Sequence, residues 1–192
     1  ITTNSVKYVT EAPHNYLSFS HLSGGSDTTE NAGLTYKQDA TLDYYNYTFT
    51  IVFEESNALA PTQTYGVLPL FGAIAGDHTQ YSLFHAGSGT RILSGVTRTV
   101  SQKRVLTLAV SSTYFDAWTN RGSYSLKVDD NATTTSNNVT LFRAAQQFMV
   151  GSSENGTASF RGKVFDVQIQ DTRLSDAEVS TLHATLRSQY GF

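Results

Sequence analysis

The amino-acid sequence predicts an all-β fold, an antiparallel sandwich with one short helix at its C-terminal end. Three observations support this prediction. Short segments of strand character recur at close spacing from start to finish. Only the last part of the chain has the apolar spacing of a helix. No internal repeat or interdomain linker interrupts the pattern, so we expect one domain over residues 1–192.

The clearest strand is residues 47–55, where Tyr47, Phe49, Ile51 and Phe53 alternate with threonines. Pro69 places residues 67–75 at a sheet edge or a bulge, because proline cannot donate to a strand ladder. The Gly-Ser-Gly stretch at 87–89 predicts a hairpin turn between two further strands. Residues 129–138 are expected to form turns. In chain order, strands are expected over residues 16–20, 34–38, 47–55, 67–75, 81–85, 91–96, 104–111, 124–128, 139–143, 148–151 and 160–170.

The last strand leads directly into the helix. Phe165, Val167 and Ile169 alternate with polar residues, as expected for a half-buried strand. Ser175 precedes Glu178 by three residues, which is the spacing of a capping box. A helix is therefore expected to start there and to turn an apolar stripe inward, formed by Val179, Leu182 and Leu186.

Composition excludes several classes of function. The chain has no cysteine, so disulfides, thiolate metal sites and cysteine catalysis are excluded. The net charge of −3 offers no basic footprint for nucleic acid. No apolar run approaches the roughly 18 residues that span a bilayer, so no membrane insertion is expected. Ile1 does not open a signal peptide, and we expect the chain to be a fragment of a longer protein.

The closing segment resembles a laminin G-like domain of the concanavalin A-like lectin/glucanase superfamily, as found in its bacterial and phage members. Such domains typically end with a glycine, an apolar strand, a short break and a helix start. Further segments resemble the family's strands in the same order: "YTFTIVFEES", "KRVLTLAVSS", "YSLKVDDN" and "FMVGSSENGTASFRGKV". The matching closing residues are Gly162, Val164, Val167, Ile169, Leu174, Ser175, Asp176, Ala177 and Glu178.

The resemblance implies a jelly roll of two packed antiparallel sheets with the final helix covering the rim. It spans about residues 47–186 and departs from the family at one informative place. Many members have Asp-Glu where this chain has Phe165 and Asp166, and an inward aspartate there helps to hold calcium. Because Phe165 cannot ligate an ion, no cofactor is expected, calcium included.

The carboxylates do not follow a hydrolase pattern. Glycoside hydrolysis needs two carboxylates that face each other across the bond. The superfamily's glucanases carry E-x-D-x-x-E on one strand, a spacing absent from this sequence. Glu54 and Glu55 are adjacent, so they point to opposite faces of a strand. Gln168-Ile169-Gln170 lacks the histidine of the related Q-I-H strand of alginate lyases. We therefore expect no enzymatic activity.

The candidate ligand-binding residues lie in "TYFDAWTNRGSY", residues 113–124, interpreted as a loop. Aromatic rings suit the C–H face of a sugar, and amide, carboxylate and guanidinium groups suit its hydroxyls. The alternative interpretation is a hydrophobic flap, with Phe115 and Trp118 packed on the core. The five candidates are Tyr114, Asp116, Trp118, Asn120 and Arg121.

Three functional hypotheses follow. The first is a non-catalytic module that binds a glycan, a cell-surface polysaccharide or a host surface. It would belong to an extracellular or virion surface protein such as a phage tail fibre, spike or capsid decoration. The second is a structural sandwich that packs against other chains of a homo-oligomeric assembly. The third is a glycanase or polysaccharide lyase, which the missing carboxylate motif disfavours.

Overall fold

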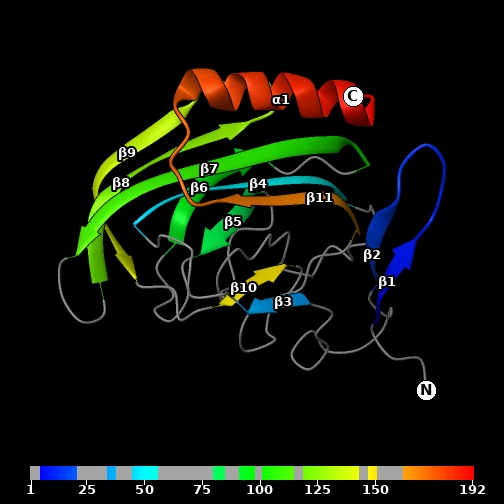
Figure 1. The fold of residues 1–192 in the computed structure, drawn as a ribbon, viewed down its shortest axis with the longest axis horizontal. Helices are drawn as coiled ribbons and strands as arrows, with labels where there is room; N and C mark the ends of the chain where they lie inside the picture. The colour runs from blue at the N-terminus through cyan, green and yellow to red at the C-terminus, as the bar shows by residue number, and fades with distance from the viewer. Residues whose placement is uncertain are drawn as a thin grey trace. The chain divides into compact units, whose positions relative to one another are not determined.

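A computed structural model describes residues 5–20, 34–37, 45–55, 80–84, 91–97, 101–114, 119–142, 147–150 and 162–192. These residues form β-strands and one α-helix, so the predicted all-β fold with a C-terminal helix is confirmed (Figure 1). The predicted strand at 67–75 lies outside the described residues. The strands are β1 (Ser5–Val9), β2 (Tyr16–Ser20), β3 (Leu34–Lys37), β4 (Asn46–Glu55), β5 (Gln80–Phe84), β6 (Arg91–Thr97), β7 (Lys103–Tyr114), β8 (Thr119–Val128), β9 (Thr134–Phe142), β10 (Gln147–Val150) and β11 (Gly162–Gln170).

The described strands form one sheet in the order β1-β2-β11-β4-β7-β8-β9 and two pairs, β10-β3 and β5-β6. Neighbours run antiparallel wherever a register is defined, including the predicted β5–β6 hairpin. The chain divides into two compact units. One contains Ile1–Gln38, Glu54–Gln102 and Ala144–Val164, and the other contains Asp39–Phe53, Lys103–Arg143 and Phe165–Phe192.

The second unit contains most of the described core. One face of its sheet is apolar, because alternate residues of β4, β7 and β8 point the same way. Part of the opposite face of β4 and β7 is also buried, where Thr50 and Thr107 lie together with Val52 and Val105. The apolar face consists of Tyr47, Phe49, Ile51, Phe53, Leu106, Leu108, Val110, Tyr124, Leu126 and Val128, each at most 8% exposed.

Helix α1 (Asp176–Tyr190) begins and ends at the expected local signals. Ser175 is the N-cap, and its side chain and that of Glu178 form the predicted capping box. These hydrogen bonds stabilise the carboxylate and hold the pKa of Glu178 below its usual value. Gly191 ends the helix in the left-handed conformation with φ 72°, which glycine adopts without steric cost.

The buried stripe of α1 differs from the predicted one. Val179 and Leu186 are buried as expected, but Leu182 is only half-buried, and His183 is 2% exposed. The inward stripe continues to Tyr190. A polar side chain with partners under the helix therefore shifts the stripe from the line that apolar spacing alone indicates.

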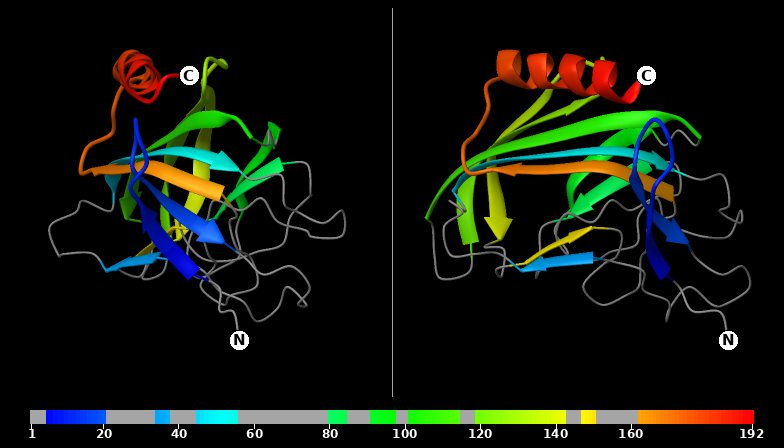
Figure 2. Two further views of the ribbon diagram at one scale, coloured as in Figure 1. Left: turned by 90° about the vertical axis from the view of Figure 1, so that its right-hand side faces the viewer. Right: turned by 45° about the vertical axis from the view of Figure 1, so that its right-hand side comes forward.

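Helix α1 lies along the second face of the sheet, above β4 and β7 (Figure 2). Val52 and Val105 pack against Leu186 and Tyr190, with Phe165 at the margin. Within the described ranges, no helix combines the length and apolar character needed to cross a membrane.

The hydroxyl of Thr48 fixes the start of α1. It donates to the carbonyl of Thr172 at 2.7 Å and accepts from the amide of Leu174 at 2.9 Å. Both partners lie in the connection between β11 and α1, so one side chain of β4 sets the path by which the chain enters the helix.

The predicted alternation in β11 is wrong as a description of burial. Val164 is buried, but residues 165–170 are all half-buried, whichever face they occupy. The described pairing of β11 with β2 ends at Val164.

Candidate functional site

Residues 113–114 and 119–124 lie in two paired β-strands, so the interpretation of segment 113–124 as a loop is wrong at both of its ends. Thr113 and Tyr114 end β7, and residues 119–124 begin β8. Tyr114 and Asn120 are paired across the two strands, and Thr113 pairs with Arg121. Of the five candidate residues, Asp116 and Trp118 lie outside the described residues.

Strand pairing at Gly122 brings the two strands into close contact. A Cβ atom at this position would lie 2.1 Å from the carbonyl oxygen of Ser111 and 2.5 Å from the Cα of Ser112. Glycine is therefore required by the approach of the backbones. The amide of Ser112 also donates to the carbonyl of Tyr45 at 2.6 Å, which ties the hairpin to the start of β4. The neighbouring residue Arg121 consequently stands on a well-fixed strand.

Arg121 belongs to a group of polar side chains on the face of the sheet that also bears α1. The strand register places Ser111 opposite Ser123 and Thr113 opposite Arg121. We call this group the polar face; it comprises Asn46, Ser111, Thr113, Arg121, Ser123 and Arg173. Of these six residues, Thr113 and Arg121 are exposed and the other four are half-buried.

Hydrogen bonds position the members of the polar face. The hydroxyl of Ser111 donates to Oδ1 of Asn46 at 2.8 Å. Nη1 of Arg173 donates to the hydroxyl of Ser123 at 2.7 Å. Ser123 and Arg121 are two residues apart on β8 and share a face, which brings the two arginine positions into one neighbourhood.

The chemistry of the polar face suits a hydroxylated or acidic ligand. Hydroxyl groups both donate and accept hydrogen bonds, and guanidinium groups bind carboxylates or sugar hydroxyls with several donors. Sequence reasoning identified Arg121 and missed Asn46, Ser111, Ser123 and Arg173. Thr107, Ser111 and Thr113, which share one face of β7, were the available local signal. The partners on β4 and before α1 are brought close only by the fold.

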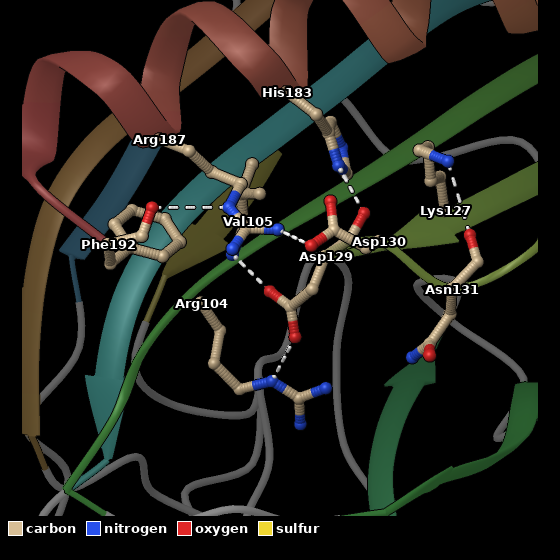
Figure 3. Close-up of polar contacts among 9 residues, drawn as sticks. All are labelled: Arg104, Val105, Lys127, Asp129, Asp130, Asn131, His183, Arg187 and Phe192. Atoms are coloured by element: carbon tan, nitrogen blue, oxygen red, sulfur yellow. Dashed lines mark hydrogen bonds and ion pairs between the residues drawn. The ribbon is translucent and has the colours of Figure 1, made fainter.

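A second polar cluster joins the β8–β9 turn to the sheet and the helix (Figure 3). Nε of Arg104 donates to Oδ2 of Asp129 at 2.7 Å, and the amide of Val105 donates to Oδ1 at 3.0 Å. Arg187 of α1 forms an ion pair with Asp130. Asp129 has a φ of 49°, the left-handed conformation of a tight turn. This cluster is structural, since its charged groups are directed at one another.

Several described carboxylates are engaged in contacts of this structural kind. No group of three or more potential metal-binding His, Cys, Asp or Glu residues occurs among the described residues. The pairs are Glu11 with Tyr16, Glu54 with Lys163, Asp129 with Arg104, Asp130 with Arg187, Asp166 with Gln168, and Glu178 with Ser175.

Phe165, which the sequence resemblance aligns with a calcium-holding residue, has other contacts in this chain. Phe165 packs against the cluster beneath α1, with its ring centroid 6.0 Å from that of Tyr190. The ammonium group of Lys103 lies 5.2 Å from the Phe165 ring centroid. This is a cation–π contact. The phenyl ring of Phe165 supplies no oxygen ligand, which calcium requires.

We therefore expect equal melting temperatures in excess calcium and in chelator. An ion that binds only the folded state raises the melting temperature with its concentration. Differential scanning fluorimetry across a calcium titration measures this directly. A calcium-dependent rise would contradict the expectation and direct attention to Asp27, Asp77 and Asp116, which lie outside the described residues.

Comparisons with known proteins reveal a similarity of fold. No family model matches the chain, and no curated protein matches it. Trypanosoma rangeli sialidase in complex with the inhibitor DANA is similar over 93% of this chain, with 17% identity and a TM-score of 0.55. A native heptameric SAP-like pentraxin from Limulus polyphemus is similar over 93% of this chain and 80% of its own, with 14% identity and a TM-score of 0.49.

The sialidase is a much longer protein. This chain spans 28% of its length, so only a part of the sialidase corresponds to the present fold. At 17% identity the similarity shows a shared fold and carries no catalytic residue to this chain.

Proposed function

We propose that this chain is a non-catalytic module that binds a glycan or cell-surface polysaccharide. It would act within an extracellular or virion surface protein such as a phage tail fibre, spike or capsid decoration. The observation that carries the proposal is the polar face, in which Arg121 and hydroxyl groups of β7 and β8 lie near Asn46 of β4 and Arg173 of the connection before α1. Such groups match the hydrogen-bonding needs of sugar hydroxyls and sugar carboxylates.

The carboxylate contacts support the non-catalytic part of the proposal. A glycosidase directs two carboxylates at a substrate bond, and it keeps one of them protonated. In this chain Asp129 and Asp130 are held by arginines, and Glu178 caps a helix. These groups serve the fold rather than a substrate.

Glycan binding should depend on Arg121. We expect a glycan-array screen to identify a ligand whose dissociation constant rises about tenfold to a hundredfold in Arg121→Ala, because a hydrogen bond to a charged group contributes about 1.5–3 kcal/mol. Fluorescence of Trp118, the single tryptophan, provides the titration signal. Lys7→Ala is the matched control, since it removes one exposed positive charge from β1 and should leave affinity unchanged.

Two outcomes would overturn the proposal. One is an array with no bound glycan, or one on which Arg121→Ala binds as tightly as the unaltered chain. The other is release of reducing or unsaturated ends from a bound polysaccharide, lost in a single Asp or Glu variant, which would establish an enzyme.

The structural hypothesis rests on a different surface. Tyr8 is 67% exposed on β1, the outermost strand of the seven-stranded order among the described residues. Strand edges with exposed side chains of this kind pair readily with another chain. If assembly is the main role, sedimentation velocity should detect a homo-oligomer that Tyr8→Lys dissociates.

A further inference from the structure

The imidazole of His183 connects the helix to the sheet beneath it. The side chain is 2% exposed, although histidine is a titratable group. Its Nδ1 lies 3.1 Å from the carbonyl oxygen of Asp129, toward which Figure 3 shows the ring directed. Its Nε2 lies 2.9 Å from the hydroxyl of Thr107 on β7, and that hydroxyl is 2.9 Å from the hydroxyl of Thr50 on β4.

These contacts determine the proton positions. A carbonyl oxygen can only accept, so Nδ1 must carry the proton and donate to Asp129. In the neutral ring Nε2 is then an acceptor, which requires Thr107 to donate its hydroxyl proton to the ring. Thr107 in turn accepts from Thr50. The buried chain of hydrogen bonds is therefore complete with a neutral imidazole.

Protonation of the ring disrupts this chain. In the imidazolium both nitrogens are donors, so Nε2 and the Thr107 hydroxyl proton would be directed at each other. Thr107 and Thr50 would both have to reorient, and the new charge would lie in a site closed to water. Burying a charge without a paired partner is costly, so the docked helix favours the neutral ring.

We propose that His183 makes the docking of α1 sensitive to acid: protonation of its imidazole releases the helix from β4 and β7. Other contacts also hold the helix: Val52 and Val105 pack against Leu186 and Tyr190, Arg187 pairs with Asp130, and Lys103 donates to the carbonyl of Tyr190. Because the histidine lies within the buried stripe of α1, its charge state acts on the whole contact. Release would uncover Val52 and Val105, which are fully buried in the docked state.

The environment of His183 as a whole also favours the neutral imidazole. Burial lowers the pKa of His183, and this is the largest effect, while Lys127 on β8 lowers it further. The Asp129 carbonyl contact and the negative charges of Asp129 and Asp130 raise the pKa and do not compensate. Both carboxylates already hold ion pairs, Asp129 with Arg104 on β7 and Asp130 with Arg187 on α1, which limits their attraction for a new positive charge.

The pH dependence follows from this lowered pKa. The released imidazole has an ordinary pKa of about 6.5, and the docked one has a lower value. The released state therefore binds more protons between these two values, and docking strengthens as pH rises through that window. As the pH falls below about 6.5, docking weakens by up to about tenfold per pH unit.

Hydrogen exchange on the full chain tests this proposal. After correction for the intrinsic pH dependence of exchange, we expect the amides of α1 to exchange up to about tenfold faster per pH unit below about 6.5. The amides of β8 should change less. His183→Gln, which stays uncharged, should lose this dependence. His14→Gln is the control, because it removes a half-buried histidine between β1 and β2 and should leave the dependence intact.

A nitrogen-15 NMR titration of the unaltered chain keeps the proposal testable even if His183→Gln does not fold. We expect the His183 ring to carry its proton on Nδ1 at neutral pH and to titrate below about 6.5. Protonation of Nε2 at neutral pH, titration at or above the ordinary value, or exchange in α1 that does not respond to acid would each overturn the proposal.

Discussion

Replacing Leu186 with alanine is expected to lower the free energy of unfolding by about 2–5 kcal/mol, the cost of truncating a buried leucine. Leu186 is 1% exposed and packs with Val52, Val105 and Tyr190. Truncation removes the buried methyl groups and leaves a cavity between the helix and the sheet, which this rigid contact can only partly fill. Chemical denaturation of the unaltered chain and of Leu186→Ala, with equal slopes, measures the difference.

Leu182→Ala is the matched control for this prediction. Leu182 has the same side chain on the same helix, but it is half-buried and lines an open groove of about 470 Å³ between α1 and the end of β11. Its truncation leaves no closed cavity, so the loss should be clearly smaller. Equal losses in the two variants would show that α1 is rotated from the described position.

Replacing Asp129 with alanine is expected to lower the free energy of unfolding by about 3 kcal/mol, in the range for breaking a buried ion pair. The side chain of Arg104 is 8% exposed and would lose its carboxylate partner. The amide of Val105 would lose an acceptor. Alanine would also be strained at φ 49°, where aspartate and asparagine are tolerated. The 26% exposure of the Asp129 side chain gives water some access and keeps the estimate at the lower end of the range.

Two controls separate these contributions. Asp129→Asn preserves the turn conformation and an acceptor oxygen for Val105 and removes only the charge, so its effect should be intermediate. Asp130→Ala removes the adjacent carboxylate, which is 81% exposed and paired with Arg187, and exposed pairs contribute about 0–1 kcal/mol. Equal losses for Asp129→Ala and Asp130→Ala would contradict the assignment of a buried pair.

Local patterns predicted the strands and the helix start where side chains alternate strongly. The strand predicted at residues 47–55 was correct because apolar and polar residues there follow a period of two. The observed strand, β4, extends from Asn46 to Glu55. The capping box at Ser175 was correct because its hydrogen bonds join residues three positions apart. β1 was not predicted, since its sequence, SVKYV, has a short and weak alternation. β9 begins at Thr134, within the region expected to form turns, because its pairing with β8 compensates for residues of low strand preference.

The candidate site likewise contains residues that could be identified from the sequence and residues that could not. Arg121 was identifiable because it lies in a segment rich in aromatic and polar groups. Ser123, Arg173 and Asn46 were not, because the hydrogen bonds that gather them connect distant parts of the chain. A loop was expected at residues 113–124, whereas β7 extends to Tyr114 and β8 begins at Thr119 and pairs with it.

The sequence by itself determined the all-β class, most strand positions and the point at which the helix begins, because each depends on interactions between residues close along the chain. Only the tertiary structure decided which helical side chains turn inward. Apolar spacing pointed to Leu182, but Thr107 and the carbonyl of Asp129 supply hydrogen-bond partners beneath the helix, which His183 uses and a leucine cannot. A polar residue becomes a core residue when its hydrogen-bond partners are already in place beneath it. Here those partners come from β7 and from the β8–β9 turn, more than fifty positions away along the chain.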